Sequence, residues 1–291
     1  MLRDGVSGDW IGTFAGHKGA VWSCKLDPTG NLAATASGDF SVSVWDAITG
    51  QALFTNNNAK SKSSKGSVFQ HDHIVKTCDF SPDSQLLATG GHEGILRIYD
   101  LTKAPNIKAP IKIPQPTTDT DSKKKVYINK CCWVSNTTIL TGCTDGKIRI
   151  WEIQRSSSGP QVPSAPSHTL ETDGAEIRDL EVKRIDSGAI ILTVAAGQKV
   201  YFFDLQSFAK IHVYDMPIHF RDEGGASLHP SGKRFIAGGS DLWVRVFDFE
   251  TGEEVECLKG HHGPIRCLRY SPDGTRYASG SEDGTIRLWK S

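Results

Sequence analysis

A short strand that ends in an aromatic residue recurs six times along this chain of 291 residues, and this repeat limits the fold more than any other feature. The intervals between successive copies are 54, 52, 52, 44 and 42 residues. Self-similarity at such a period is typical of repeat architectures, in which one structural unit is copied along the chain. The copies end at Trp45, Tyr99, Trp151, Phe203, Phe247 and Trp289.

Each copy has the pattern of antiparallel strands joined by tight turns. "SPDS" at 81–84 and "SPDG" at 271–274 place Pro and Gly or Asp where a turn follows the opening strand of a copy. "DG" at 145–146 and 283–284 supplies the positive φ that a two-residue hairpin needs. Short strands at even spacing predict an all-β fold. An acidic residue lies six positions before the aromatic in five copies: Asp39, Glu93, Asp145, Asp241 and Asp283.

Two copies also begin with Gly-His, at 16–17 and 260–261. The order Gly-His, hairpin, Asp and Trp at this period resembles the WD40 repeats, in which each repeat builds a four-stranded blade of a β-propeller. The resemblance implies one propeller domain over residues 1–291 with six sets of inner strands.

Charge and cysteine content exclude several classes of protein. Lys plus Arg equals Asp plus Glu at 33 each, so no net positive field favours direct nucleic-acid binding. The longest apolar run, eight residues at 189–196, is too short to cross a membrane. Cys131, Cys132 and Cys143 lack zinc-site spacing and are interpreted as buried strand cysteines. No phosphate-binding loop or metal motif is found, so no cofactor or small-molecule substrate is expected.

Two of the copies contain a histidine, a hydroxyl, a carboxylate and a tryptophan in the same order. These residue types occur in nucleophilic catalysis, but their repetition along the chain favours an architectural role. The WD40 resemblance implies a hydrogen-bonded chain from indole through hydroxyl and imidazole to carboxylate, and no enzyme activity. The expected structural tetrads are His17, Thr35, Asp39 and Trp45, and His261, Ser279, Asp283 and Trp289.

The two ends of the sequence suggest how the propeller is completed. No outer strand follows Trp289, while residues 9–14 align with 253–258, the outer strand that precedes the last Gly-His. We therefore expect the N-terminus to supply the outer strand of the last blade, which removes an unpaired edge. Residues 1–4 align with the end of an inner strand, so we also expect a seven-bladed parent, testable in the reading frame upstream of Met1.

One column of residues follows the first apolar residue of the opening strands and predicts a partner-binding rim. Trp and Arg are frequent anchors at interfaces, and loops held by a rigid scaffold commonly bind partners. The expected partner carries an acidic or phosphorylated peptide surface; the alternative is that long side chains merely cover the strand starts. The column is Trp22, Lys76, Asn129, Arg178 and Arg266.

Three polar inserts account for the long early intervals. Residues 56–67, 103–125 and 154–167 are rich in Ser, Lys or Pro, a composition typical of mobile loops. "KKK" at 123–125 is interpreted as a solvated surface run rather than an RNA contact. The serines of these inserts are potential phosphorylation sites.

Three stretches, at 8–22, 73–101 and 251–289, resemble the family of serine/threonine-kinase-receptor-associated proteins. That family is seven-bladed and non-enzymatic, and the resemblance implies a scaffold subunit of the survival-of-motor-neuron complex, which assembles spliceosomal RNPs. It implies Gemin-type or Sm protein partners and a location in cytoplasm and nucleus. Adaptor function in transforming-growth-factor-β receptor signalling is an alternative. A second resemblance, to subunit i of eukaryotic translation initiation factor 3, rests on the "GHKGAVW" and "GHHGPI" starts at 16 and 260.

Overall fold

A computed structural model describes most of the chain. The predicted insert at 56–67 lies outside the described residues. These are 1–54, 69–104, 107, 109–116, 125–156, 159–161, 163–221 and 224–291.

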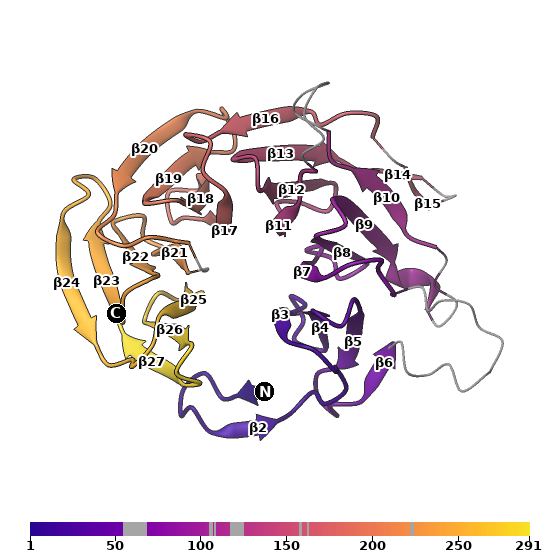
Figure 1. The fold of residues 1–291 in the computed structure, drawn as a ribbon, viewed down its shortest axis with the longest axis horizontal. Coiled ribbons are helices and arrows are strands. Elements are labelled where there is room, and N and C mark those ends of the chain that lie inside the picture. Colours follow the sequence, from indigo (N-terminus) through magenta and orange to yellow (C-terminus); the bar gives the residue numbers. More distant parts are fainter. Residues whose placement is uncertain are drawn as a thin grey trace. The chain divides into compact units, whose positions relative to one another are not determined.

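The chain divides into two compact units, Met1–Thr169 and Leu170–Ser291. Within the described residues each unit contains three sheets of three or four strands (Figure 1). Paired strands are consecutive along the chain, except that β16 follows β13 after the β14–β15 ribbon. The only described helix is the three-residue 3₁₀ helix η2 (Leu101–Lys103). The predicted all-β class with six sets of repeat strands is therefore confirmed.

The first unit holds three four-stranded sheets and two short ribbons. Its last sheet ends with β16, at which the chain passes into the second unit. The sheets are β3 (Val21–Leu26), β4 (Leu32–Ser37), β5 (Val42–Asp46) and β6 (Ala52–Phe54); β7 (Val75–Phe80), β8 (Leu86–Gly91), β9 (Ile95–Asp100) and β10 (Ile111–Pro114); and β11 (Ile128–Trp133), β12 (Thr138–Cys143), β13 (Lys147–Glu152) and β16 (His168–Glu171). The ribbons are β1 (Leu2–Arg3) with β2 (Trp10–Gly12), and β14 (Gln154–Ser156) with β15 (Gly159–Gln161).

The second unit continues the same pattern with two four-stranded sheets and one of three strands. They are β17 (Ile177–Arg184), β18 (Ile190–Ala196), β19 (Lys199–Asp204) and β20 (Lys210–Asp215); β21 (Gly225–Leu228), β22 (Arg234–Gly238), β23 (Trp243–Asp248) and β24 (Glu254–Lys259); and β25 (Ile265–Tyr270), β26 (Arg276–Ser281) and β27 (Ile286–Lys290).

Apolar residues gather between successive sheets of the same unit. In the first unit, Val44 of one sheet and Val75 of the next belong to one buried cluster. In the second unit, Phe202 and Phe235 of adjacent sheets lie in another, with ring centroids 5.0 Å apart. A sheet buried on both faces explains why the middle strand of each blade is nearly continuous in small and apolar residues.

The inserts predicted as loops contain strands. β10 lies inside 103–125, where it pairs with β9 and buries Ile113, and β14 and β15 lie inside 154–167. The loop prediction is wrong at these residues because an outer strand pairs on one side only and so tolerates proline. Pro114 ends β10 in this way.

At the N-terminus, β2 pairs with β1 in a two-stranded ribbon, and the last described sheet has three strands, with β27 as its third. The two elements belong to different units. The outer strand predicted for the last blade from residues 9–14 therefore stays a prediction, as does the single-domain organisation.

Candidate functional site

The first predicted tetrad is hydrogen-bonded from end to end. Trp45 Nε1 donates to Thr35 Oγ1 at 2.8 Å, which lies 2.8 Å from His17 Nε2, and His17 Nδ1 lies 3.0 Å from Asp39 Oδ2. The residues come from β4, β5, the turn between them and the segment before β3. One chain of polar groups thus connects three successive parts of the blade.

The second tetrad repeats this geometry in the other unit. Trp289 Nε1 donates to Ser279 Oγ at 2.8 Å, and Ser279 Oγ lies 2.7 Å from His261 Nε2. The Nδ1 atom of His261 lies 3.2 Å from an oxygen of Asp283. Each of the two tetrads expected from the WD40 resemblance is therefore hydrogen-bonded within its own unit.

The tetrad hydroxyls are poorly placed for nucleophilic catalysis. Each accepts from an indole, so its single proton is directed toward the imidazole Nε2, while Nδ1–H donates to the carboxylate. Thr35 is 5% exposed and Ser279 1% exposed. A substrate cannot reach either oxygen without opening the sheet, so the geometry serves strand pairing.

A third histidine set was missed by the sequence reasoning. His71 lies 3.1 Å from Glu93 Oε2 through Nδ1, and 3.1 Å from Thr89 Oγ1 through Nε2. The Tyr99 hydroxyl replaces the indole, 3.3 Å from Nε2. The spacing could have revealed this set, because His71 precedes Tyr99 by 28 residues, just as His17 precedes Trp45. His71 follows Gln70 rather than a glycine, so the Gly-His pattern did not mark it.

The sequence reasoning also missed three arginines that form ion pairs with the recurring acidic residues. Arg97 pairs with Glu93, Arg149 Nη2 with Asp145 at 2.5 Å, and Arg245 Nη2 with Asp241 at 2.9 Å. Each arginine follows its acid by four residues and precedes the aromatic by two. The pattern was visible in the sequence, and in the third blade, which has no histidine in the set, the arginine gives the acidic residue a partner.

Two blades keep part of a tetrad with substituted members. Gln115 takes the place of the histidine in the third blade, where its Oε1 accepts from Thr141 at 3.1 Å. In the fourth blade Thr193 is buried, and its hydroxyl has no hydrogen-bond partner. Phe203, which stands where other blades have tryptophan, offers no indole N–H to this hydroxyl.

The carboxylates of these hydrogen-bonded sets make the stability of the fold depend on pH. Burial by itself raises the pKa of Asp39, but hydrogen bonds from Ser41, Lys18 N–H and His17 outweigh it and lower the pKa to about 2. Burial also raises the pKa of Glu93, but hydrogen bonds from His71 and Arg97 outweigh it and lower this pKa to about 2.

We expect the chain to lose stability as the pH falls from about 4.5 toward 2. A carboxyl whose pKa is lower in the folded state stabilises the fold above its unfolded pKa, and that contribution is lost as pH falls through the folded value. Urea midpoints measured by circular dichroism between pH 6 and pH 2.5 test this. Asp39→Asn should flatten the dependence, and the exposed Asp9→Asn should not; parallel curves for both variants would contradict it.

Part of the predicted rim lies together in the first unit. The Lys76 ammonium lies 3.4 Å from the centre of the Trp22 ring, a cation–π contact between the first two blades. Trp22 is 38% exposed, whereas Asn129 is only 6% exposed. Asn129 therefore presents little surface to a partner, because it is covered within the unit.

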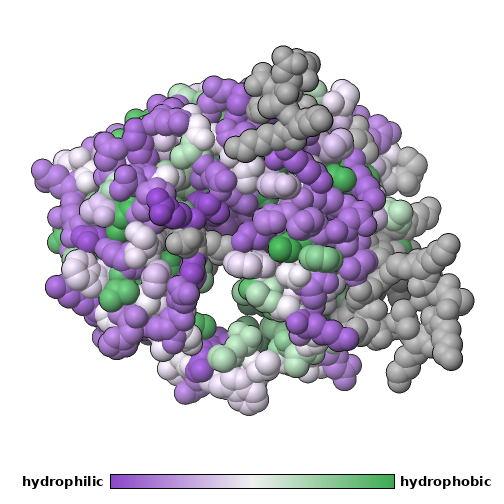
Figure 2. Space-filling model, viewed as in Figure 1, coloured by the Kyte–Doolittle hydropathy of each residue, from purple (hydrophilic) through white to green (hydrophobic). Residues whose placement is uncertain are grey.

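The two rim arginines lie in the second unit and are both ion-paired. Arg178 Nη2 lies 2.6 Å from Glu176, and Arg266 Nη2 lies 2.7 Å from Glu282. Both glutamates are about half exposed, so water screens the pairs and a partner can compete for the guanidinium groups. Figure 2 shows a mainly hydrophilic face on which hydrophobic atoms form small separate groups.

The cysteines divide by environment. Cys78 and Cys143 are buried, and burial raises the pKa of each thiol to about 12. Cys24 and Cys267 are exposed. The prediction of a buried cysteine is wrong at Cys132, which is half-buried because successive residues of β11 point to opposite faces and the buried ones there are Cys131 and Trp133. Within the described residues no group of three metal-ligating side chains is found, and no helix is long and apolar enough to cross a membrane.

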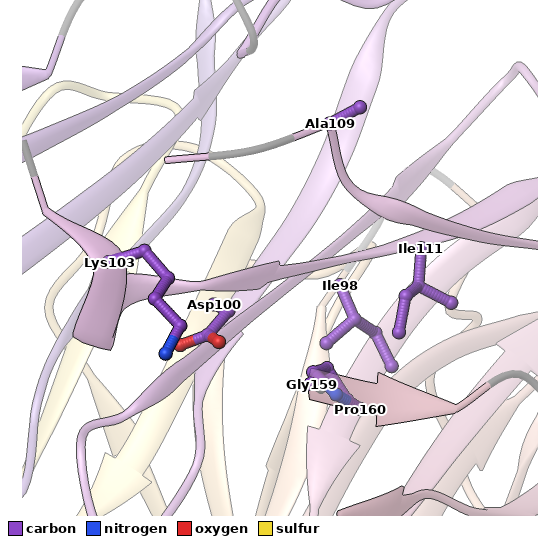
Figure 3. A pocket seen from close by; sticks show the side chains of 7 residues that line it. All are labelled: Ile98, Asp100, Lys103, Ala109, Ile111, Gly159 and Pro160. Atoms are coloured by element: carbon purple, nitrogen blue, oxygen red, sulfur yellow. The ribbon is translucent and has the colours of Figure 1, made fainter. Parts of the chain in front are cut away.

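A pocket of about 140 Å³ lies on the outer side of the first unit. Figure 3 shows Asp100 and Lys103 on one side of it and Ile98 and Ile111 on the other, with Pro160 of β15 beside them. Among the described residues that line it there is one acid and one amine, and no nucleophile paired with a base.

The family model for the WD domain, G-beta repeat, matches four parts of the chain: residues 8–46, 63–100, 117–152 and 252–290. The unmatched stretch contains the fourth and fifth blades, which end in Phe203 and Phe247. Both blades have phenylalanine where the repeat has tryptophan, and the fourth also has Ala175 at the histidine position, whereas in the fifth His219 precedes Phe247 by the usual 28 residues. The fold therefore extends beyond the sequence signature.

Several curated relatives align along the whole chain. A serine-threonine kinase receptor-associated protein from Dictyostelium discoideum is 43% identical over all of this chain and 86% of its own length. The protein of that name from Homo sapiens is 38% identical over all of this chain and 72% of its own length. Subunit I of eukaryotic translation initiation factor 3 from Culex quinquefasciatus is 27% identical over 97% of this chain and 84% of its own length.

Proposed function

Because this chain belongs to the serine-threonine kinase receptor-associated protein family of WD40-repeat proteins, we propose that it is a scaffold subunit of the survival-of-motor-neuron complex in spliceosomal RNP assembly. The identity of 38–43% over the full chain carries the proposal. Gemin-type or Sm proteins are the proposed partners, in cytoplasm and nucleus. The WD40 scaffold class itself is generally non-catalytic, and no enzyme activity is proposed.

The blade geometry supports a scaffold. Hydrogen-bonded tetrads fix the inner strands, and the first residues of the opening strands include Trp22 and Lys76 in one unit and Arg178 and Arg266 in the other. Side chains at such positions bind with little loss of backbone entropy, because the sheet already holds the backbone that carries them.

Two other functions follow from the relatives. Twenty-seven percent identity over 97% of the chain supports a translation-initiation subunit, at a lower level of similarity than the leading family. The name of the leading family, which refers to association with a receptor kinase, also supports a role as an adaptor of such a kinase. All three are binding functions, and the fold serves each of them.

Affinity purification of the tagged full chain from its native cells, followed by mass spectrometry, tests the proposal. Gemin-type and Sm proteins are the expected partners. Recovery of initiation-factor subunits in their place would move the chain to the translation role, and recovery of receptor kinases alone would favour the adaptor. Either of these outcomes would overturn the assembly proposal.

Reversing the two rim arginines of the second unit, Arg178→Glu with Arg266→Glu, is expected to reduce partner capture at least 10-fold. The change repels an acidic partner and leaves each new carboxylate beside the glutamate that the arginine had paired. Because these side chains are partly exposed, the melting temperature should change little.

The matched control is Arg184→Glu with Arg234→Glu, which makes the same charge change at two exposed arginines of the second unit, at the end of β17 and the start of β22. Capture is measured by quantitative mass spectrometry of the purified complex. Equal loss in both double variants would show a general charge effect, and no loss in either would refute the acidic-partner prediction.

A further inference from the structure

Phe40 occupies a backbone position that suits glycine. It lies in the turn between β4 and β5, directly after Asp39, with φ of +68°. The corresponding turns of the second and third blades have Gly94 and Gly146 there, with φ of +72° and +75°. A bulky residue at positive φ is strained because its Cβ approaches the carbonyl oxygen, so the fold alone favours glycine.

The strained phenylalanine begins a row of aromatic rings along the first unit. Phe40 and His73 have ring centroids 5.6 Å apart, His73 and His92 5.5 Å, and His92 and Tyr127 5.1 Å. Phe40 and His73 are exposed, and His92 and Tyr127 are half-buried. We call these four residues the aromatic strip.

The strip is built by loops at one end of the blades. His73 lies just before β7, His92 in the turn after β8, and Tyr127 just before β11, beside the starts of the strands that carry the predicted rim (Figure 1). Adjacent rings are inclined by 35–49°, so the strip is ridged rather than flat. Inclined rings do not offer the parallel faces on which nucleic-acid bases stack, and they better fit a ligand whose own side chains project at intervals.

The charged residues beside the strip are of both signs, so they favour neither an anionic nor a cationic ligand. Asp72, adjacent to His73, has a side chain that is 88% exposed, and the exposed Lys125 lies near Gly94. An exposed carboxylate disfavours the phosphates of a single strand of RNA, and the lysine disfavours an arginine-rich segment. The rings themselves are therefore the recognition element, which points to an uncharged apolar segment.

We propose that the aromatic strip binds a proline-rich segment of a partner protein in the polyproline II conformation. Proline rings pack on aromatic rings, and the polyproline II helix loses little entropy on binding because it is already extended. The three centroid separations limit the strip to about 16 Å, the length of about five residues at 3.1 Å each. The inference rests on the proposed scaffold function only in that the ligand is a protein.

Fluorescence anisotropy with the purified full chain tests the inference independently of any cellular complex. The probes are fluorescein-labelled decaproline, a flexible (Gly-Ser)₅ peptide, an (Arg-Gly)₅ peptide and decauridine. Saturable binding of decaproline, at least 10-fold tighter than that of the flexible peptide, is expected. Absence of saturable decaproline binding, or tighter binding of the arginine peptide or the RNA, would overturn the inference.

Phe40→Gly should weaken decaproline binding at least 10-fold while leaving the melting temperature unchanged or higher, because it removes both the ring and the backbone strain. Phe208→Gly is the matched control: Phe208 also has positive φ, at +59°, but lies in the other unit. His73→Ala is a second strip variant that leaves the backbone of the turn intact. A lower melting temperature for Phe40→Gly, or equal binding by the Phe40 and Phe208 variants, would overturn the inference.

Discussion

Replacing Trp45 with alanine is expected to lower the free energy of unfolding by about 3–5 kcal/mol. Trp45 is 1% exposed and packs on Phe14 with ring centroids 5.6 Å apart. Its indole ring also lies against Gly16, where an added Cβ would be 3.0 Å from the ring. Alanine leaves a cavity that the packed residues around it cannot fill. It also removes the indole N–H that donates a hydrogen bond to Thr35.

A second substitution separates the cavity from the hydrogen bond. Trp45→Phe keeps most of the ring but loses the N–H, and should cost about 1–2 kcal/mol beyond its smaller packing loss. Trp10→Ala is the control, because Trp10 is 62% exposed and its loss should change stability by less than about 0.5 kcal/mol. Urea unfolding followed by circular dichroism measures all three. A cost below about 1 kcal/mol for Trp45→Ala would show that the tetrad does not hold the blade.

Replacing Arg269 with methionine is expected to cost about 3 kcal/mol, the second large effect. Arg269 holds Asp179 through two hydrogen bonds, Nη1 to Oδ2 at 2.6 Å and Nη2 to Oδ1 at 2.7 Å. They connect β25 to β17 within the second unit. Methionine keeps the apolar stem of the side chain, so the loss reports the guanidinium itself.

The two partners of this pair differ in exposure, which predicts an asymmetry. The Asp179 side chain is 4% exposed and that of Arg269 35% exposed. Removing the arginine takes two charge-assisted hydrogen bonds from a buried carboxylate, whereas Asp179→Asn leaves a cation that water still reaches. Asp179→Asn should therefore cost less, and the double variant should recover part of the loss of Arg269→Met. Equal costs for the two single variants in urea unfolding would contradict this account.

The sequence by itself determined the blades and their tetrads. The repeat places the same residue types at the same separations, and a hydrogen-bonded set within one blade uses only residues within about thirty positions of each other. Spacing together with the WD40 resemblance therefore located His17, Thr35, Asp39 and Trp45. His71 and the arginines such as Arg97 followed the same periodicity and were available to the same reasoning.

Only the tertiary structure decided the contacts between blades and the use of the irregular segments. The ion pair of Asp179 with Arg269, the contact of Lys76 with Trp22 and the ring row from Phe40 to Tyr127 join residues from different repeats. Their residue types do not recur, so no period reveals them. Residues 111–114, inside the Pro-rich insert, became an outer strand because β9 offered an unpaired edge. Local propensity favours a loop there, since it takes no account of a partner strand supplied by the rest of the sheet.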